Sequence, residues 1–392
     1  MQQPPSAPHE TPWRALLAPI GTISVFGLAS GLAFPLVSLR LVQAGAPAAI
    51  IAVMAALPAA GTIGISFALP SLARRCGAKP LLVAAILLSG AGLVVLATSY
   101  VAATWMLARL AMGISAGILF ALGEARVLEV SSDAARGRWT GVYASTLTTC
   151  QFAGPALLAY LGTDSSAPIL IAVALHGLSL ILLANSRWHS ALPARGDSLA
   201  WRQFVRYCLP LGAAVLFFSM FDSTMLALLP VYALKLGFDG REALLMVTAV
   251  FLGDACLQIP IGWGADRFGR PRVHALCALL CAVAALALPL GLMANAARWP
   301  CLLLMGGTAG ALYTLAIVRL GDRFSGNALI SANAFVGLLW GAGSLGGPLL
   351  GSLSMGVLAP HGLMLFVAAG ATLALLSMLN RRAPDGREAM AS

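Results

Sequence analysis

Three charged residues lie inside long runs of apolar residues, where a charge is unfavourable. Asp222 follows Phe-Ser-Met-Phe, Asp254 follows Phe-Leu-Gly, and Arg109 begins the stretch Arg-Leu-Ala-Met-Gly. A charged group in such surroundings normally faces a cavity or a partner. Burial in a medium of low dielectric disfavours the charged form of a carboxyl group, so such an acid can bind and release a proton near neutral pH. The two acids therefore predict proton coupling or the binding of a cationic substrate.

Each of the three residues also has a structural interpretation. Arg109 could extend from near the outer end of its run to the lipid headgroups, and each acid could bond to a neighbouring helix, Arg109 included. Gln151, Tyr313 and Asn333 are polar residues of other apolar runs, and the sequence does not fix where they point. Our candidates for the substrate and proton pathway are Arg109, Asp222, Asp254, Gln151, Tyr313 and Asn333.

The apolar runs that hold these residues have the length of bilayer spans. Hydrophobic residues make up 59% of the 392-residue chain and charged residues 10%, whereas a soluble domain carries about 25% charged residues. A helix needs about 20 apolar residues to cross a bilayer. The sequence predicts an all-α membrane protein with twelve transmembrane helices, at residues 15–39, 47–69, 80–98, 101–123, 139–161, 167–184, 205–231, 244–264, 273–293, 300–320, 328–353 and 363–379.

The positive charges predict the side of the membrane on which each loop lies, because Lys and Arg collect in cytoplasmic loops. When the N-terminus is placed in the cytoplasm, most of the 24 Lys and Arg residues fall on that side. Arg40, Lys235, Arg241 and Arg298 fall on the other side, and Arg109 lies within a span. We expect a multi-pass protein of the bacterial inner membrane with both termini in the cytoplasm. The net charge of +10 then reflects topology and not the binding of nucleic acid.

The two halves of the chain resemble each other at regularly spaced positions. At an offset of 193 residues, the matches are Gly113 with Gly306, Gly117 with Gly310, Arg126 with Arg319, and Gly154-Pro155 with Gly347-Pro348. At an offset of 192 residues, Arg75-Cys-Gly77 matches Arg267-Phe-Gly269. Separated matches at nearly one offset indicate the duplication of a six-helix unit, with the repeats related by an axis along the membrane normal. We expect six-helix bundles at residues 1–186 and 205–392, joined by a cytoplasmic linker at 187–204.

The loop after the eighth span carries the sharpest motif, Gly262-Trp-Gly-Ala-Asp266-Arg267-Phe-Gly269-Arg270. It predicts a Gly-containing turn at the cytoplasmic surface, where Asp266 can form charge-assisted bonds to an Arg or to a helix N-terminus. Such a latch would hold the two bundles together in one state and release them in another. The matching loop of the first half has Arg74 in place of the acid, so the carboxylate contact must come from the second half. The predicted gating residues are Gly262, Asp266, Arg267, Gly269, Arg270, Arg75 and Gly77.

Glycines spaced four residues apart predict close packing of helices, because they let two backbones approach each other. Gly113 and Gly117 follow Arg109 at this spacing, and Gly343 and Gly347 precede Pro348. A Gly-Pro pair also bends a helix. The predicted packing and bending residues are Gly113, Gly117, Gly154, Pro155, Gly343, Gly347 and Pro348.

These motifs resemble those of the major facilitator superfamily. The loop motif is similar to the family signature GxLaDRxGRr, with Gly264 in place of the Leu, and the fourth span resembles the family's RxxxGxxxG. The Gly-Pro motif of the eleventh span resembles the antiporter motif that the family carries in its fifth span. Leu257-Gln-Ile-Pro-Ile-Gly262 and Ala309-Gly-Ala-Leu-Tyr313 are similar to the YcaD-type group of bacterial members. The resemblance implies the two-bundle fold and alternating access, and it implies no particular substrate.

We therefore expect a secondary active transporter that moves a small solute by alternating access, coupled to protons and directed toward efflux. The alternatives are an uptake symporter for a small metabolite and a membrane sensor or scaffold without transport. The five His are dispersed along the chain and the seven Cys form no CxxC pair, so we expect no enzyme, no metal site and no other cofactor. The expected partners are the lipid bilayer, a small-molecule substrate and protons, and the expected state is a monomer.

Overall fold

The computed structural model describes residues 12–99, 101–130, 136–165, 167–186, 201–293, 297–324 and 326–379. Over these residues the chain forms twelve helices and no strand. The helices of the first half are α1 (Pro12–Gln43), α2 (Ala48–Cys76), α3 (Ala78–Thr98), α4 (Ala102–Val130), α5 (Arg136–Leu161) and α6 (Ala167–Ala184). Those of the second half are α7 (Trp201–Lys235), α8 (Gly240–Phe268), α9 (Arg270–Met293), α10 (Arg298–Arg323), α11 (Gly326–Val357) and α12 (Gly362–Leu379).

Each helix overlaps one predicted span, and most helices extend beyond it. A helix can continue past the hydrocarbon layer because its backbone hydrogen bonds are made within the helix itself. The largest extensions carry charged residues at their ends, as in α8, which continues to Asp266 and Arg267. Helix α7 begins at Trp201, inside the predicted linker, and residues 187–200 lie outside the described part of the chain. The exact bounds of that linker remain a prediction.

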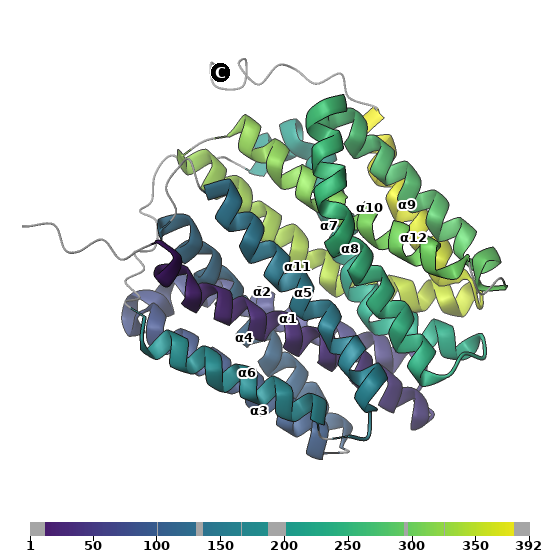
Figure 1. Cartoon of the computed structure of the whole chain (residues 1–392), viewed down its shortest axis with the longest axis horizontal. Coiled ribbons are helices and arrows are strands. Elements are labelled where there is room, and N and C mark those ends of the chain that lie inside the picture. Colours follow the sequence, from purple (N-terminus) through teal and green to yellow (C-terminus); the bar gives the residue numbers. More distant parts are fainter. Residues whose placement is uncertain are drawn as a thin grey trace, which may run out of the picture.

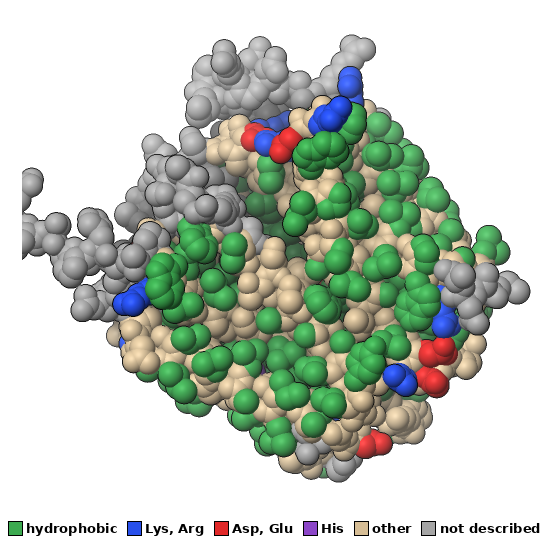
Figure 2. Space-filling model, viewed as in Figure 1, with side chains coloured by type: hydrophobic (Ala, Val, Ile, Leu, Met, Phe, Trp, Pro, Cys, Tyr) green, Lys and Arg blue, Asp and Glu red, His purple; other side chains and the backbone are tan. Residues whose placement is uncertain are grey.

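The surface of the bundle is suited to lipid. Eleven of the described helices are long and apolar enough to cross a membrane. The exception is α5, whose first turn carries Arg136 and Arg138 and whose middle is rich in Ser, Thr and Gln. Figure 2 shows charged side chains gathered toward opposite ends of the molecule, with a largely hydrophobic belt between them. Large apolar side chains are exposed along this belt, including Phe67, Ile259 and Leu290. The prediction of an all-α membrane protein is confirmed.

The helices form two bundles that pack alike (Figure 1). In the first half α1 packs on α5, and α4 packs on α2 and α3; in the second half α7 packs on α11, and α10 packs on α8 and α9. Across the halves, α2 packs on α11 and α5 packs on α8, which are equivalent pairs under the repeat. Helices α1 and α7 also meet and are the most enclosed of the candidate spans. This arrangement confirms the predicted pair of six-helix bundles, and it leaves α1, α2, α5, α7, α8 and α11 at the junction.

Glycines hold equivalent helix crossings in both halves. A Cβ atom at Gly154 of α5 would overlap the backbone of Gly31 in α1, and one at Gly347 of α11 would overlap Met220 and Thr224 in α7. The same holds for two further pairs in the repeat: Gly113 of α4 meets Pro58 of α2, and Gly306 of α10 meets Val250 of α8. Gly31 and Thr224 differ by the same 193 residues as Gly154 and Gly347. The two halves therefore share the internal repeat in their sequences and also in the backbone contacts between their helices.

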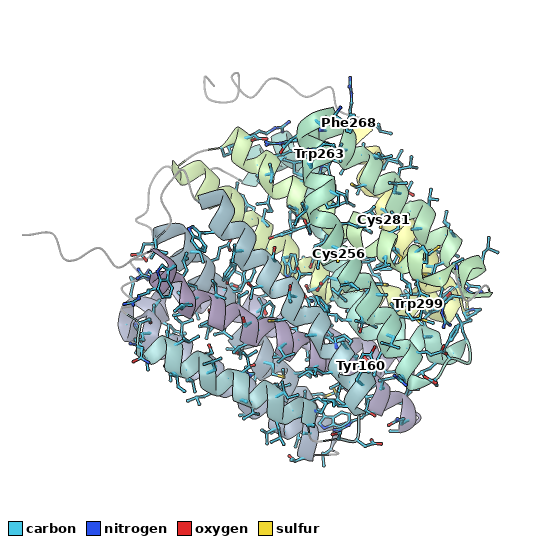
Figure 3. The ribbon with its side chains drawn as sticks, viewed as in Figure 1. Tyr160, Cys256, Trp263, Phe268, Cys281 and Trp299 are labelled. Carbon is cyan, nitrogen blue, oxygen red and sulfur yellow. The ribbon has the colours of Figure 1, made fainter. Side chains whose placement is uncertain are left out.

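Two equivalent turns mark one end of the bundle. Gly77 between α2 and α3 has φ +81° and Gly269 between α8 and α9 has φ +93°, a backbone region that strongly favours glycine. We call this the α8–α9 end and the opposite one the α7–α8 end. Figure 3 shows Trp263 and Phe268 at the α8–α9 end, and Trp299 and Tyr160 toward the α7–α8 end.

The glycine crossings predict a sharp difference between two adjacent residues. Gly347→Ala should lower stability by about 1–3 kcal/mol, because the added methyl group overfills the contact of α11 with Met220 and Thr224. Gly346→Ala is the matched control, since a Cβ atom at Gly346 meets no atom within 4 Å. The measurement is the fraction of detergent-purified protein that stays monodisperse in size-exclusion chromatography after heating. Equal melting curves for the two variants would contradict the crossing.

Candidate functional site

A hydrogen bond between two predicted site residues joins the halves in the interior. Gln151 of α5 donates from Nε2 to Oδ1 of Asp222 of α7, at 3.0 Å. Both side chains are buried, and Asp222 is 8% exposed. A Cβ atom at Gly31 of α1 would overlap the backbone of Gln151, so the glycine lets α5 approach the centre of the bundle. The structure thus brings together an amide and a carboxyl group that lie in different halves of the sequence.

Asp254 lies in the second half and is held by neutral side chains. It is 5% exposed, and its Oδ1 accepts a hydrogen bond of 2.7 Å from Nε2 of Gln258, one turn further along α8. Oε1 of Gln258 accepts in turn from Oγ1 of Thr314 of α10, also at 2.7 Å. A Cβ atom at Gly310 of α10 would overlap the carboxyl group of Asp254. Gly310 therefore provides the space in which this carboxyl group lies between α8 and α10.

The two acids lie near each other without a basic partner. Asp222 and Asp254 are close enough for their charges to interact. Within the described residues, neither forms an ion pair, and only Oδ1 of each accepts a side-chain hydrogen bond. Two like charges in a buried setting repel each other, and each also loses the solvation of water. The arrangement therefore favours the uptake of a proton or the binding of a cation.

Arg109 does not supply the missing positive charge. Its side chain is 1% exposed and its guanidinium group lies over the ring of Phe34 of α1, at 3.9 Å from the centroid. Nε donates to the backbone oxygen of Met54 of α2 at 3.2 Å, while Nη2 has no hydrogen-bond partner. Arg109 is therefore enclosed between α1, α2 and α4, and in this structure it neither extends to the headgroups nor pairs with an acid.

Three aromatic rings from three helices gather beside the acids. Tyr313 of α10 and Trp340 of α11 have ring centroids 5.1 Å apart, and Phe218 of α7 lies 5.5 Å from the first and 5.6 Å from the second. The plane of Trp340 is inclined to the other two rings by 71° and 63°, whereas Phe218 and Tyr313 stack at 28°. Phe218 is buried, whereas Tyr313 and Trp340 are half-buried. We call Phe218, Tyr313 and Trp340 the aromatic wall.

A third acid approaches the aromatic wall from the first half. Glu124 of α4 is half-buried and lies close enough to Tyr313 of α10 and Tyr143 of α5 for its charge to act on both hydroxyl groups. Tyr313 therefore lies within electrostatic reach of an acid of the first half, and it is partly exposed. Carboxyl groups and aromatic rings therefore come together in this part of the interior.

The predicted gating residues lie at the α8–α9 end. Arg270 donates to Asp322 of α10 at 2.6 Å and 2.5 Å, and it also bonds to Asp266 at 3.2 Å. All three residues belong to the second half, so in this state the arginine ties α8, α9 and α10 together. The guanidinium group of Arg267 lies over the ring of Trp263, at 5.4 Å. Arg75 is exposed beside Gly77 in the equivalent turn, and a Cβ atom at Gly262 would meet no atom within 4 Å.

The predicted packing residues lie at helix contacts. A Cβ atom at Gly117 of α4 would meet Thr62 and Ile65 of α2, and one at Gly343 of α11 would meet Leu216 and Ser219 of α7. Pro155 lies inside α5 and Pro348 inside α11, one residue after the glycines that form the α1–α5 and α7–α11 crossings. Asn333 belongs to α11, but its side chain lies outside the part of the chain that the structure describes.

Several residues of the site were missed by the sequence reading. Gln258 and Thr314 complete the hydrogen bonds around Asp254, Phe218 and Trp340 complete the aromatic wall, and Asp322 pairs with Arg270. Phe218 precedes Asp222 by one helical turn, and Gln258 follows Asp254 by one turn, so helical spacing from the acids could have found both. Trp340 and Asp322 carry no comparable signal, because their role depends on which helices meet.

Comparison with known proteins agrees with this architecture. The family model described as the Major Facilitator Superfamily matches residues 20–240 and 211–390. An uncharacterized MFS-type transporter of Bacillus subtilis, YfkF, is 26% identical over 364 residues, which are 88% of this chain and 90% of that protein. An uncharacterized MFS-type transporter of Shigella flexneri, YcaD, is 23% identical over 292 residues, which are 70% of this chain and 72% of that protein.

Solved structures of transporters have the same fold. A D-xylose-proton symporter superposes with a TM-score of 0.75 at 17% identity, covering 96% of this chain and 98% of that one. A mutant of the nucleoside transporter NupG superposes with a TM-score of 0.71 at 12% identity, covering 93% and 99%. These proteins are transporters and not enzymes, as the sequence predicts for this chain. The chain belongs to the major facilitator superfamily and is a secondary transporter.

Proposed function

We propose that the protein exports a small solute from the cytoplasm in exchange for protons, as a monomer in the bacterial inner membrane with both termini in the cytoplasm. The observation that carries the proposal is the pair of buried acids, Asp222 and Asp254, which lie without a basic partner at the junction of the two bundles. The same two acids would bind the solute in one state and a proton in the other, so that one site would handle both.

Transport by alternating access requires contacts between the two halves to break and form again. At the α7–α8 end, Oγ of Ser352 in α11 donates to the backbone oxygen of Ala48 in α2 at 3.1 Å, and Arg241 of α8 lies over the ring of Tyr160 of α5. A cavity of about 280 Å³ lies at the same end, between the α1–α2 connection and the last turns of α7. These contacts must separate before the interior can open toward that end. At the opposite end, Arg270 would exchange its partners Asp266 and Asp322 in the same movement.

Protonation of Asp222 would ease that separation. Pulling α5 away from α7 breaks the bond from Gln151, and a charged carboxylate that loses a hydrogen bond in a buried site is strongly penalised. A protonated, neutral carboxyl group loses much less. Proton binding would therefore lower the cost of moving one bundle against the other, which couples the proton to the conformational change.

The runner-up is an uptake symporter for a small metabolite. The D-xylose-proton symporter shares the fold, but at 17% identity it says nothing about the substrate or direction of this chain. Efflux is favoured by the Gly347-Pro348 motif, which resembles the antiporter motif. That support is partial, because the family carries this motif in the fifth span and the better copy here lies in α11.

Proton exchange can be measured before the substrate is known. In everted membrane vesicles acidified by respiration, adding an exported solute should release protons and restore the fluorescence of a pH-sensitive dye. We expect a panel of organic cations, anions, sugars and nucleosides to contain at least one active solute. Asp254→Asn and Asp222→Asn should reduce its response at least tenfold, because a neutral amide cannot carry the proton. Asp164→Asn, at an exposed position of the α5–α6 connection, is the control.

Two results would count against this mechanism. A full response in the Asp222→Asn, Asp254→Asn double variant would show that these acids do not carry the proton. Solute-dependent proton entry in right-side-out vesicles, with none in everted vesicles, would identify the uptake symporter instead.

The orientation has its own test with cysteine labelling. Cys76 is exposed at the α8–α9 end, and Asp164 is exposed at the opposite end. In a background without other cysteines, a membrane-impermeant maleimide should label Asp164→Cys in intact cells. It should label Cys76 only after the membrane is permeabilised. The reverse pattern would place the termini outside the cell.

A further inference from the structure

We propose that the interior site binds an organic cation, held by the aromatic wall on one side and by Asp222 and Asp254 on the other. This proposal rests on the proposed transport function, and it adds the chemical class of the transported solute. The candidate ligand is a lipophilic ammonium or phosphonium ion, whose charge is spread over apolar groups. The case depends on where the rings lie, how near the acids are, and where positive charge is absent.

The aromatic wall offers the surface that such a cation prefers. A cation is attracted to the face of an aromatic ring within about 6 Å of its centroid, most strongly for Trp. Trp340 and Tyr313 are both half-buried, and Tyr313 lies within electrostatic reach of Glu124 of the first half. The indole plane is steeply inclined to the phenol ring and to Phe218, at 71° and 63°, so neither ring stacks on it.

The acids lie within about one helical turn of these rings. Phe218 and Asp222 are four residues apart on α7, which places them on one face of the helix at a rise of about 6 Å. Gly310, against which the Asp254 carboxyl group lies, precedes Tyr313 by three residues on α10. A cation on the wall would therefore lie beside both carboxyl groups. In each acid it would approach the side of Oδ2, since Oδ1 accepts from Gln151 or Gln258.

No described basic side chain competes for these acids. The guanidinium group of Arg109 is occupied by the ring of Phe34 and the backbone of Met54, within the first half. The next arginine along α10, Arg319, bonds to His274 of α9. An anion would need a positive charge at the site, and a sugar would need free hydrogen-bonding groups, whereas the amides of Gln151 and Gln258 already bond to the acids. Buried carboxyl groups beside an aromatic wall suit a cation that carries few hydrogen-bond donors.

The decisive experiment compares two ions of matched shape and opposite charge. Purified protein in detergent is incubated with radiolabelled tetraphenylphosphonium, and bound ion is measured by scintillation proximity. Unlabelled tetraphenylborate, which has the same four phenyl groups and a negative charge, serves as the competitor of wrong sign. We expect saturable binding of the phosphonium ion that unlabelled phosphonium displaces and tetraphenylborate does not.

Variants of the wall and of the acids assign the binding to this site. Trp340→Leu and Tyr313→Leu should each weaken binding about tenfold, while Trp340→Phe and Tyr313→Phe, which keep a ring, should lose less. Asp222→Asn should weaken binding by a similar factor without changing the elution profile of the protein. Trp13→Leu, at an exposed position early in α1, and Asp164→Asn are the matched controls and should bind like the parent.

Binding that is unchanged in Trp340→Leu, Tyr313→Leu and Asp222→Asn would overturn the assignment, as would equal displacement by tetraphenylborate. The measurement needs no proton gradient and no transport. Cation binding with the expected variant pattern would therefore support the site even if vesicles showed no proton movement, and that second result would count against the proposed exchange mechanism alone.

Discussion

The structure depends on one electrostatic constraint: two carboxyl groups are held inside a membrane bundle, and no basic side chain of the described residues pairs with them. Asp222 and Asp254 are both more than nine-tenths buried, and each is bonded by a neutral amide rather than by an arginine or lysine. Such groups are tolerated in the interior when they can take up a proton or meet a cation. The arrangement is therefore poorly suited to pure stabilisation and well suited to an exchange.

The rest of the fold places these two groups at the junction of parts that can move. Glycines at repeated positions bring α5 against α1 and α11 against α7, so each bundle is a tightly packed unit. The bond from Gln151 to Asp222 crosses between the units, whereas the bonds of Asp254 stay within one of them. Asp222 is therefore bonded across the contact between the bundles, whereas Asp254 is bonded only within the second bundle.

The sequence was sufficient for the architecture and for placing Asp222 and Asp254 inside apolar spans, and it was insufficient for the partners of these two acids. Hydropathy predicts the spans because it is a property of a single segment, and the offset of 193 residues predicts the repeat because it is a pattern along the sequence. The pairing of Gln151 with Asp222 spans 71 positions and depends on which faces of α5 and α7 meet. Asp266 was expected to latch the bundles together, and in this structure it bonds to Arg270 of its own half, which also binds the unforeseen Asp322. Local spacing cannot distinguish such contacts.

The most direct test of the central claim is infrared difference spectroscopy of the purified protein between acidic and alkaline pH. The carbonyl stretch of a protonated carboxyl group is separated from that of a carboxylate. Exposed carboxyl groups give such a band only in the acidic range, so the account predicts a further component that persists toward neutral pH. This component is lost when Asp222 and Asp254 are both changed to Asn, and it is kept in Asp164→Asn. An unchanged component in the double variant, or no such component in the parent protein, would contradict it.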